Sequence, residues 1–160
     1  MATRSNIAYR TPEGKIRSVY CHWDGYPAHN GEMLVRHYQQ ARKIAQLVEL
    51  GSLSSLQPNV FPVGEGHSFD NAQDDVCVFY GRDRGETGQE PKEFETVAEW
   101  ISEFGEEYNY LWDGQNWLVN DHSERDDNDF YVLDFVETKV TQKDLDMIGW
   151  TAEDSNSTQH

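Results

Sequence analysis

The sequence is poor in cysteine, in long apolar runs and in positive charge. Only Cys21 and Cys77 carry thiols among the 160 residues, too few for a disulfide framework, and their apolar neighbours are typical of buried free thiols. No apolar run approaches the roughly 18 residues that a membrane span requires. The first ten residues, MATRSNIAYR, also lack the apolar centre of a signal peptide. These absences predict a soluble, cytosolic protein that makes no contact with membranes.

Positive charge is scarce because 29 Asp and Glu residues outnumber 13 Lys and Arg residues, which gives a formal net charge of -16. Residues 1–63 hold seven Lys and Arg and four Asp and Glu, whereas residues 64–160 hold six and 25. Proteins bind nucleic acids through basic groups that displace phosphate counterions, so this balance excludes direct binding of DNA or RNA. The same field attracts a basic surface on a partner protein. The simpler alternative is that the acidity only keeps the protein soluble.

The length of the chain fits a single domain. Hydrophobic residues make up 37% of the chain, which is low, but aromatic residues reach 12% and each supplies a large apolar area. We therefore expect residues 1–150 to form one folded domain. Residues 151–160, TAEDSNSTQH, lack large apolar side chains and are expected to form a disordered tail.

Residue patterns predict most of the secondary structure. Residues 6–23 and 106–121 are typical of β-hairpins with turns at Pro12–Lys15 and Asp113–Gly114. Apolar residues at helical spacing predict one helix over residues 30–51, with Asn30 as its cap and Gly51 at its end. A capping box at Thr96–Glu99 predicts a second helix that ends before Gly105.

Two further strands complete the predicted sheet. The continuous apolar run Val76–Tyr80 is typical of a strand buried on both faces, so we expect it at the centre of the sheet. Residues 129–141 have the composition of another strand, and residues 141–150 end in one helical turn. The sequence therefore predicts an α+β fold, with a largely antiparallel sheet of five to six strands and two main helices.

The segment YCHWDGYP, residues 20–27, places a cysteine, a histidine and an aspartate close together. Successive side chains of a strand point to opposite faces, so Cys21 and Trp23 are expected to point inward and His22 outward. Because they point in opposite directions, Cys21 cannot act as a nucleophile with His22 as its general base. After the turn, His22, Asp24 and His29 could converge on a metal ion, but a hydrogen-bonded structural role for His22 is the favoured hypothesis.

Other catalytic and metal motifs are missing from the sequence. DHSERDDNDF, residues 121–130, lacks the central glycine and the final glutamate of a calcium loop, which favours a solvated acidic loop. There is no G-x-S-x-G nucleophile elbow and no phosphate-binding P-loop. We therefore expect no metal, no cofactor and no catalytic residue.

Two features of the charge pattern are candidate binding sites. Arg82 and Arg84 flank Asp83 after the apolar run, where they would grip a carboxylate or phosphate, or else pair with the surrounding acids. The second feature is an acidic face for a partner, formed if folding places the following residues on one side: Glu103, Glu106, Glu107, Asp121, Glu124, Asp126, Asp127, Asp129, Asp134 and Glu137. Such a face would imitate the phosphate spacing of a nucleic acid.

Four segments together resemble, in the same order, a family of small uncharacterised proteins encoded by tailed bacteriophages. The segments are SNIAYRTPEGKIRSVYCHWDGYP, LVELGSLSSL, FYGRDRGETG and EEYNYLWDGQNWLV. The resemblance covers Ser5 to Val119, and YCHWDGY and YGRDRGE are its most specific blocks. It implies a phage-encoded protein that acts in the cytoplasm of the host cell, and it assigns no activity.

Three hypotheses of function follow. The first is a non-catalytic phage accessory protein whose acidic face binds, and inhibits or redirects, a host protein with a basic surface. A DNA-mimic factor of this kind would act against a nuclease, a CRISPR or restriction component, or a transcription or repair factor. The second is a small metal- or nucleotide-dependent hydrolase that uses His22 and Asp24 with Arg82 and Arg84. The third is a minor structural component of the virion.

Overall fold

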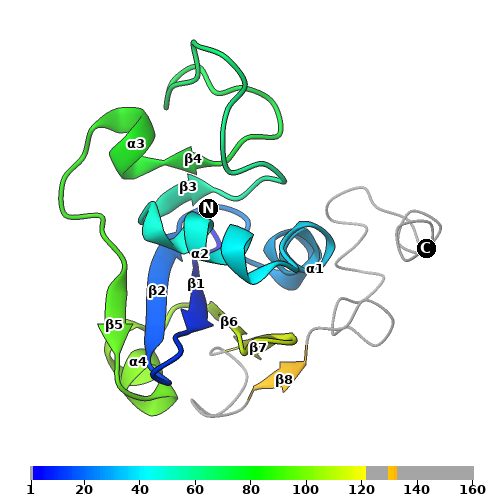
Figure 1. Cartoon of the computed structure of the whole chain (residues 1–160), viewed down its shortest axis with the longest axis vertical. Helices are drawn as coiled ribbons and strands as arrows, with labels where there is room; N and C mark the ends of the chain where they lie inside the picture. The colour runs from blue at the N-terminus through cyan, green and yellow to red at the C-terminus, as the bar shows by residue number, and fades with distance from the viewer. Residues whose placement is uncertain (1, 122–129, 133–160) are drawn as a thin grey trace.

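A computed structural model describes residues 2–121 and 130–132, and its centre is a mixed β-sheet (Figure 1). The strand order is β4-β3-β2-β1-β6-β7-β8, and β5 pairs with β2 off this path. The strands are β1 (Ser5–Arg10), β2 (Ile16–Cys21), β3 (Leu53–Ser55), β4 (Val78–Phe79), β5 (Lys92–Phe94), β6 (Tyr108–Trp112), β7 (Trp117–Asp121) and β8 (Tyr131–Val132). The helices are η1 (Pro27–Gly31), α1 (Glu32–His37), α2 (Ala41–Glu49), α3 (Tyr80–Arg84) and α4 (Val97–Phe104).

The α+β class is confirmed, but the sheet differs from the predicted one in two ways. It has more strands than the predicted five or six, because β3 and β5 are three residues long and too short to show an alternating pattern. It is also partly parallel, since β1 pairs with β6 and β2 with β3 in that direction. A parallel neighbour requires a crossover connection, and α1 and α2 supply it between β2 and β3.

The predicted helix over residues 30–51 is broken in two, which gives three helices of seven or more residues instead of two. η1 continues into α1 over residues 27–37, α2 follows after a gap, and α4 is the third. The break lies at Tyr38, whose φ of -128° and ψ of 70° leave the helical region. Tertiary contacts hold it there: the Tyr38 hydroxyl donates to the Gln57 carbonyl at 2.6 Å, and the Trp117 indole donates to the Tyr38 carbonyl at 2.8 Å.

Of the two predicted ends of this helix, the structure has the one at Gly51 but not the cap at Asn30. Asn30 does not act as a cap, because its amide donates to Ser5 Oγ and to the Trp23 carbonyl instead. Gly51 does follow the end of α2, and its φ of 96° is the left-handed conformation that glycine adopts easily. A Cβ at this position would also lie 2.4 Å from the Gln89 carbonyl oxygen.

The prediction of a central strand over Val76–Tyr80 is wrong. The strand is the two-residue β4, which lies at the edge of the sheet, and Tyr80 already begins α3. Val76, Cys77, Val78 and Phe79 are nevertheless buried. Residues 57–77, which connect β3 to β4 and lie at the top of Figure 1, cover the run on the side that a neighbouring strand would occupy.

Other predictions are confirmed within the described residues. Both hairpins form, with β1 antiparallel to β2 and β6 antiparallel to β7. Thr96 Oγ1 accepts a hydrogen bond from the Glu99 N–H at 3.1 Å, which starts α4 as the capping box predicts. The expected strand over residues 129–141 is described only at β8, and the expected terminal turn and tail lie outside the described residues. None of the helices in the described part of the chain has the length and apolar character that crossing a membrane requires.

Both faces of the sheet are covered by helices. α1 and α2 pack on one face, where Ile7, Val19 and Tyr110 join Leu34 and Leu47 in the larger apolar cluster. α4 packs on the other face, and its cluster includes Ala8, Ile16, Leu111 and Trp100. Figure 1 shows α2 in front of β1 and β2, with α4 beside β5. Neighbouring residues of one strand, such as Ile7 and Ala8, thus belong to opposite cores.

A row of three asparagines crosses the α4 face of the sheet. Asn6, Asn109 and Asn120 lie opposite one another on β1, β6 and β7, and all three are fully buried. Asn6 Nδ2 donates to Asn109 Oδ1 at 2.8 Å, and Asn109 Nδ2 donates to Asn120 Oδ1 at 3.1 Å. Asn109 also accepts from the Glu106 N–H at 3.0 Å. The row therefore ties three strands to the chain that enters β6.

Removal of the central member of this row should destabilise the fold. In Asn109→Ala the amides of Asn6 and Asn120 lose a partner in a buried position, and each such loss costs about 1–3 kcal/mol. We expect the free energy of unfolding in urea to fall by about 2–4 kcal/mol. The exposed turn variant Asn116→Ala, which keeps its backbone contact to Asp113, should change it by less than about 0.5 kcal/mol. Equal effects of the two variants would contradict a structural role for the row.

Glu32 is a buried acid at the start of α1, with a side chain that is only 2% exposed. Burial raises the pKa of its carboxyl from 4.5 to about 7, although the hydrogen bond and charge of Arg36 act in the opposite direction. The Arg36 guanidinium lies 3.1 Å from Glu32 Oε2. Between about pH 4.5 and 7, the Glu32 carboxyl is therefore protonated to a greater extent in the folded protein than in the unfolded chain.

This raised pKa predicts a pH-dependent contribution to stability. The contribution is present below pH 4.5 and is lost as the pH rises through about 7, because the unfolded chain ionises first. Glu32→Gln removes the titration, so the free energy of unfolding of the natural protein minus that of the variant should fall by roughly 3 kcal/mol between pH 4.5 and 8. Urea unfolding across this range checks it, and parallel curves for the two proteins would contradict it.

Candidate functional site

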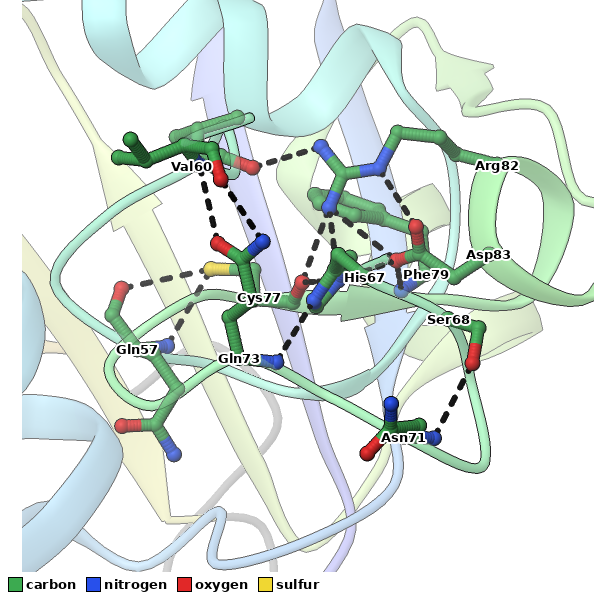
Figure 2. A network of polar contacts seen from close by, with 11 residues as sticks. Gln57, Val60, His67, Ser68, Asn71, Gln73, Cys77, Phe79, Arg82 and Asp83 are labelled. Atoms are coloured by element: carbon green, nitrogen blue, oxygen red, sulfur yellow. Dashed lines mark hydrogen bonds and ion pairs between the residues drawn. The ribbon is translucent and has the colours of Figure 1, made fainter. Parts of the chain in front are cut away.

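Arg82 lies inside a network of polar contacts and not on an open surface (Figure 2). Its Nε donates to Asp83 Oδ1 at 2.8 Å, and its Nη2 donates to Asp83 Oδ2 at 3.1 Å. The remaining donors reach two backbone carbonyls, that of Val60 at 2.6 Å and that of Cys77 at 3.0 Å. The guanidinium also lies over the Phe79 ring, 4.7 Å from its centroid. The structure thus uses Arg82 to join α3 to the segment 57–77.

His67 is a second member of this network, and no spacing in the sequence pointed to it. Its Nδ1 accepts from the Gln73 N–H at 3.0 Å, so the proton of the neutral ring is on Nε2. Nε2 lies 3.3 Å from Asp83 Oδ2 and 3.2 Å from the Cys77 carbonyl. Burial acts to raise the pKa of the Asp83 carboxyl, but hydrogen bonds from Arg82 and the Phe79 N–H outweigh it and hold this pKa below its ordinary value. Asp83 is therefore an internal counter-ion.

Arg84 points away from this network. It is exposed, pairs with Glu86 at 3.1 Å, and lies 4.7 Å from the centroid of the Phe69 ring. Arg82 and Arg84 therefore contact different groups. The arrangement matches the alternative in which the two arginines pair with neighbouring acids, because each has a carboxylate partner within the protein.

His22, Asp24 and His29, which could have converged on a metal ion, each have a different hydrogen-bond partner. Tyr20 OH lies 2.6 Å from His22 Nδ1, Tyr26 OH donates to Asp24 Oδ1 at 3.1 Å, and His29 Nδ1 lies 2.9 Å from Asn30 Oδ1. No group of three His, Cys, Asp or Glu side chains suited to a metal ion occurs among residues 2–121 and 130–132. Cys21 and Cys77 are free and buried, and burial raises the pKa of Cys21 to about 12.

The expectation that Trp23 packs inward is wrong, because its side chain is 44% exposed. The strand ends at Cys21, so the alternation of faces no longer applies two residues later. Asp24 then turns the chain with a φ of 56°, which is rare for a residue other than glycine. The Trp23 ring packs edge-on against His22 with a centroid distance of 4.6 Å. An aromatic cluster of Tyr20, His22 and Trp23 therefore reaches the surface.

This cluster lies at the end of the sheet where β1 and β6 begin and β2 ends. Ser5 pairs with both Cys21 and Tyr108, so the residues that flank these positions are neighbours in space. Arg4 and Glu106 both act on the pKa of Tyr20: burial raises this pKa to about 12, Arg4 opposes the rise and Glu106 adds to it. Glu106 is therefore close enough to Tyr20 to act on it, and Glu107 follows Glu106 before β6 at this end of the sheet. We call Tyr20, His22, Trp23, Glu106 and Glu107 the aromatic–acidic end.

The structure brings together only some of the acids expected to form one face. Glu103 is exposed on α4, and Glu106 and Glu107 follow in the connection to β6. Burial raises the pKa of Glu106, which Arg4 opposes and Glu107 reinforces. Asp121 is near in the sheet, opposite Tyr108, but it is buried and shares its face with Trp117 and Val119, away from α4. The remaining members lie outside the described residues: Glu124, Asp126, Asp127, Asp129, Asp134 and Glu137.

Comparison with known proteins adds no assignment to this geometry. No family model, curated protein or solved structure matches the chain. A proposal for the function therefore depends on the surface chemistry described above.

The internal role of Arg82 predicts that lysine cannot replace it. Lys lacks the planar fork that reaches Asp83 and two carbonyls together, so Arg82→Lys should lower the free energy of unfolding by about 2–4 kcal/mol. Arg84→Lys is the matched control, and its exposed ion pair should contribute less than about 1 kcal/mol. Urea unfolding of both variants tests this difference. A loss of stability in Arg84→Lys that equals the loss in Arg82→Lys would contradict the assignment.

Proposed function

We propose that the protein is a non-catalytic accessory protein that binds a basic surface on a partner protein through the aromatic–acidic end. The resemblance of the chain to proteins of tailed bacteriophages supports a phage origin, which would make the partner a protein of the host cell. Binding would inhibit or redirect that partner. A host factor that itself binds nucleic acid is the kind of target that presents such a basic surface.

The observation that carries this proposal is an exposed tryptophan, Trp23, at the end of the sheet where Glu106 acts on Tyr20. Tryptophan is enriched among the residues that contribute most of the binding energy at protein interfaces. Trp23 is 44% exposed and packs against the His22 ring, which in turn contacts the Tyr20 ring. The face of an indole attracts the guanidinium of Arg or the ammonium of Lys, and Glu106 and Glu107 supply matching negative charge. The surface is therefore complementary to a partner rich in Lys and Arg.

The charge of the whole chain supports the same partner. With a net charge of -16, the protein attracts a basic partner over a distance and repels nucleic acid. Carboxylates that lie close together also imitate the phosphates of a nucleic acid, and Glu103, Glu106 and Glu107 follow one another at this end of the sheet. Mimicry of DNA would let the protein occupy the nucleic-acid site of its target.

Capture from a host lysate, with the retained proteins identified by mass spectrometry, tests the proposal. A partner should bind at about 50 mM salt and be released at about 500 mM. At the higher concentration the Debye length is only a few ångströms, so the attraction between opposite charges on the two proteins is screened. Trp23→Ala and the double variant Glu106→Gln with Glu107→Gln should each weaken binding of the captured partner by at least about tenfold.

Matched variants on the segment 57–77 serve as controls. Val63→Ala removes an apolar side chain that is 84% exposed, and Glu65→Gln with Asp70→Asn removes two exposed charges. Neither should change the affinity by more than about twofold, since both lie outside the aromatic–acidic end. A partner that binds equally well at both salt concentrations, or that tolerates both site variants, would contradict the proposal.

A further inference from the structure

A pocket of about 340 Å³ that is open to the surface lies between the start of α2 and the segment 57–77, remote in sequence from the aromatic–acidic end. Its size falls within the range of small-molecule sites, which is roughly 300–1,000 Å³. Two cations, three amides and one phenyl ring line most of it: Arg42, Lys43, Gln40, Gln46, Asn59 and Phe61. The lining combines groups that bind an anion with groups that bind a flat apolar ring.

The cavity is positively charged within a strongly acidic protein. It is lined by two cations and no acid, although the chain as a whole carries a net charge of -16. Arg42 makes no hydrogen bond or ion pair to any residue in the described part of the chain, so its guanidinium is available to a ligand. Lys43 Nζ donates to the carbonyls of His37 and Pro58, each at 2.7 Å, and lies 4.3 Å from the centroid of the Tyr38 ring, so these contacts fix the ammonium at the wall of the pocket.

The position of these cations in α2 increases their preference for an anion. Arg42 and Lys43 lie in the first turn, where the helix dipole is positive and acidic residues are the stabilising choice. Gln40 precedes the helix without a side-chain hydrogen bond to its free N–H groups. An anion bound between Arg42 and Lys43 would neutralise this accumulation of positive charge. The helix end adds to the charge of the cavity, while the two side chains provide the contacts.

Phe61 supplies the apolar half of the cavity. Its side chain is 52% exposed, and it lies in the apolar run Val60–Val63, whose Val63 is also exposed. The backbone beside it is rigid, because the Val60 carbonyl accepts from Arg82 Nη1 at 2.6 Å. A flat ring can stack on an exposed aromatic side chain of this kind. The amides of Gln40, Gln46 and Asn59 are the donors and acceptors that would contact its polar edge.

We propose that this cavity binds a mononucleotide, with the phosphate between Arg42 and Lys43 and the base on Phe61. The acidic residues Asp74 and Asp75 do not line this pocket, so they do not repel a bound phosphate from its walls. Asp75 contacts Asn59 through its backbone carbonyl, at 3.0 Å from the Asn59 nitrogen, and lines a separate cavity of about 460 Å³ with Asp74. The site uses no residue of the aromatic–acidic end, so it is independent of the proposed function.

Isothermal titration of the purified protein with AMP, adenosine and inorganic phosphate tests this site. AMP should bind, and adenosine and phosphate should each bind at least about tenfold more weakly, because each lacks one half of the ligand. GMP, CMP and UMP establish the preference for the base. If none of the four nucleotides binds at about 10 mM, or if phosphate alone binds as tightly as AMP, the proposal is overturned.

Variants then locate the bound nucleotide. Arg42→Gln and Phe61→Ala should each weaken AMP binding by about tenfold, while Arg10→Gln, which removes another exposed arginine, should leave it unchanged. Trp23→Ala should also bind AMP like the natural protein, which separates this result from the test of partner binding. Circular dichroism confirms that each variant is folded. AMP binding that survives both Arg42→Gln and Phe61→Ala would place the nucleotide elsewhere and overturn the assignment.

Discussion

The parallel pairing of β1 with β6 is the constraint on which the rest of the molecule depends. It joins residues about a hundred positions apart in the sequence, with Ser5 opposite Tyr108 and Asn6 opposite Asn109. A shift of the register by one residue would exchange the two faces of β6, so that Leu111 and Tyr110 would enter the wrong cores. A shift by two would keep the faces but separate Asn6 from Asn109. The asparagine row therefore selects one register where the apolar pattern permits several.

This pairing also creates the surface that we propose to be functional. The turn after β2 carries Trp23, and the connection after α4 carries Glu106 and Glu107. Neither segment contains a motif with chemistry of its own, and only the common end of β1, β2 and β6 brings them together. The Arg82 network performs a similar task at the β4 edge of the sheet, where it fastens the irregular segment 57–77 over β4. Segments of this length without regular structure commonly serve a function, and this one supplies a wall of the Arg42 cavity.

Local patterns in the sequence predicted what local interactions determine. The turns of both hairpins, the capping box at Thr96 and the burial of the two thiols depend on residues a few positions apart. Two of the errors come from contacts between distant segments. The predicted helix over residues 30–51 breaks because Tyr38 is held by Gln57 and Trp117, and the apolar run at Val76–Phe79 is buried by a loop instead of a second strand. Trp23 was misplaced because a strand pattern says nothing about where the strand stops. The acids near β6 were identified from composition, whereas their aromatic neighbours and the Arg42 cavity required the fold.

The central claim is that a basic partner docks on the aromatic–acidic end, and the indole N–H signals of the tryptophans test it most directly. Trp23 is exposed, whereas Trp100, Trp112 and Trp117 are no more than 6% exposed. In an NMR titration with a peptide rich in Lys and Arg, taken from the basic surface of a captured partner, the Trp23 indole signal should shift or broaden. The signals of the three buried tryptophans should stay in place. A titration that leaves the Trp23 signal unchanged while the peptide binds would contradict the account.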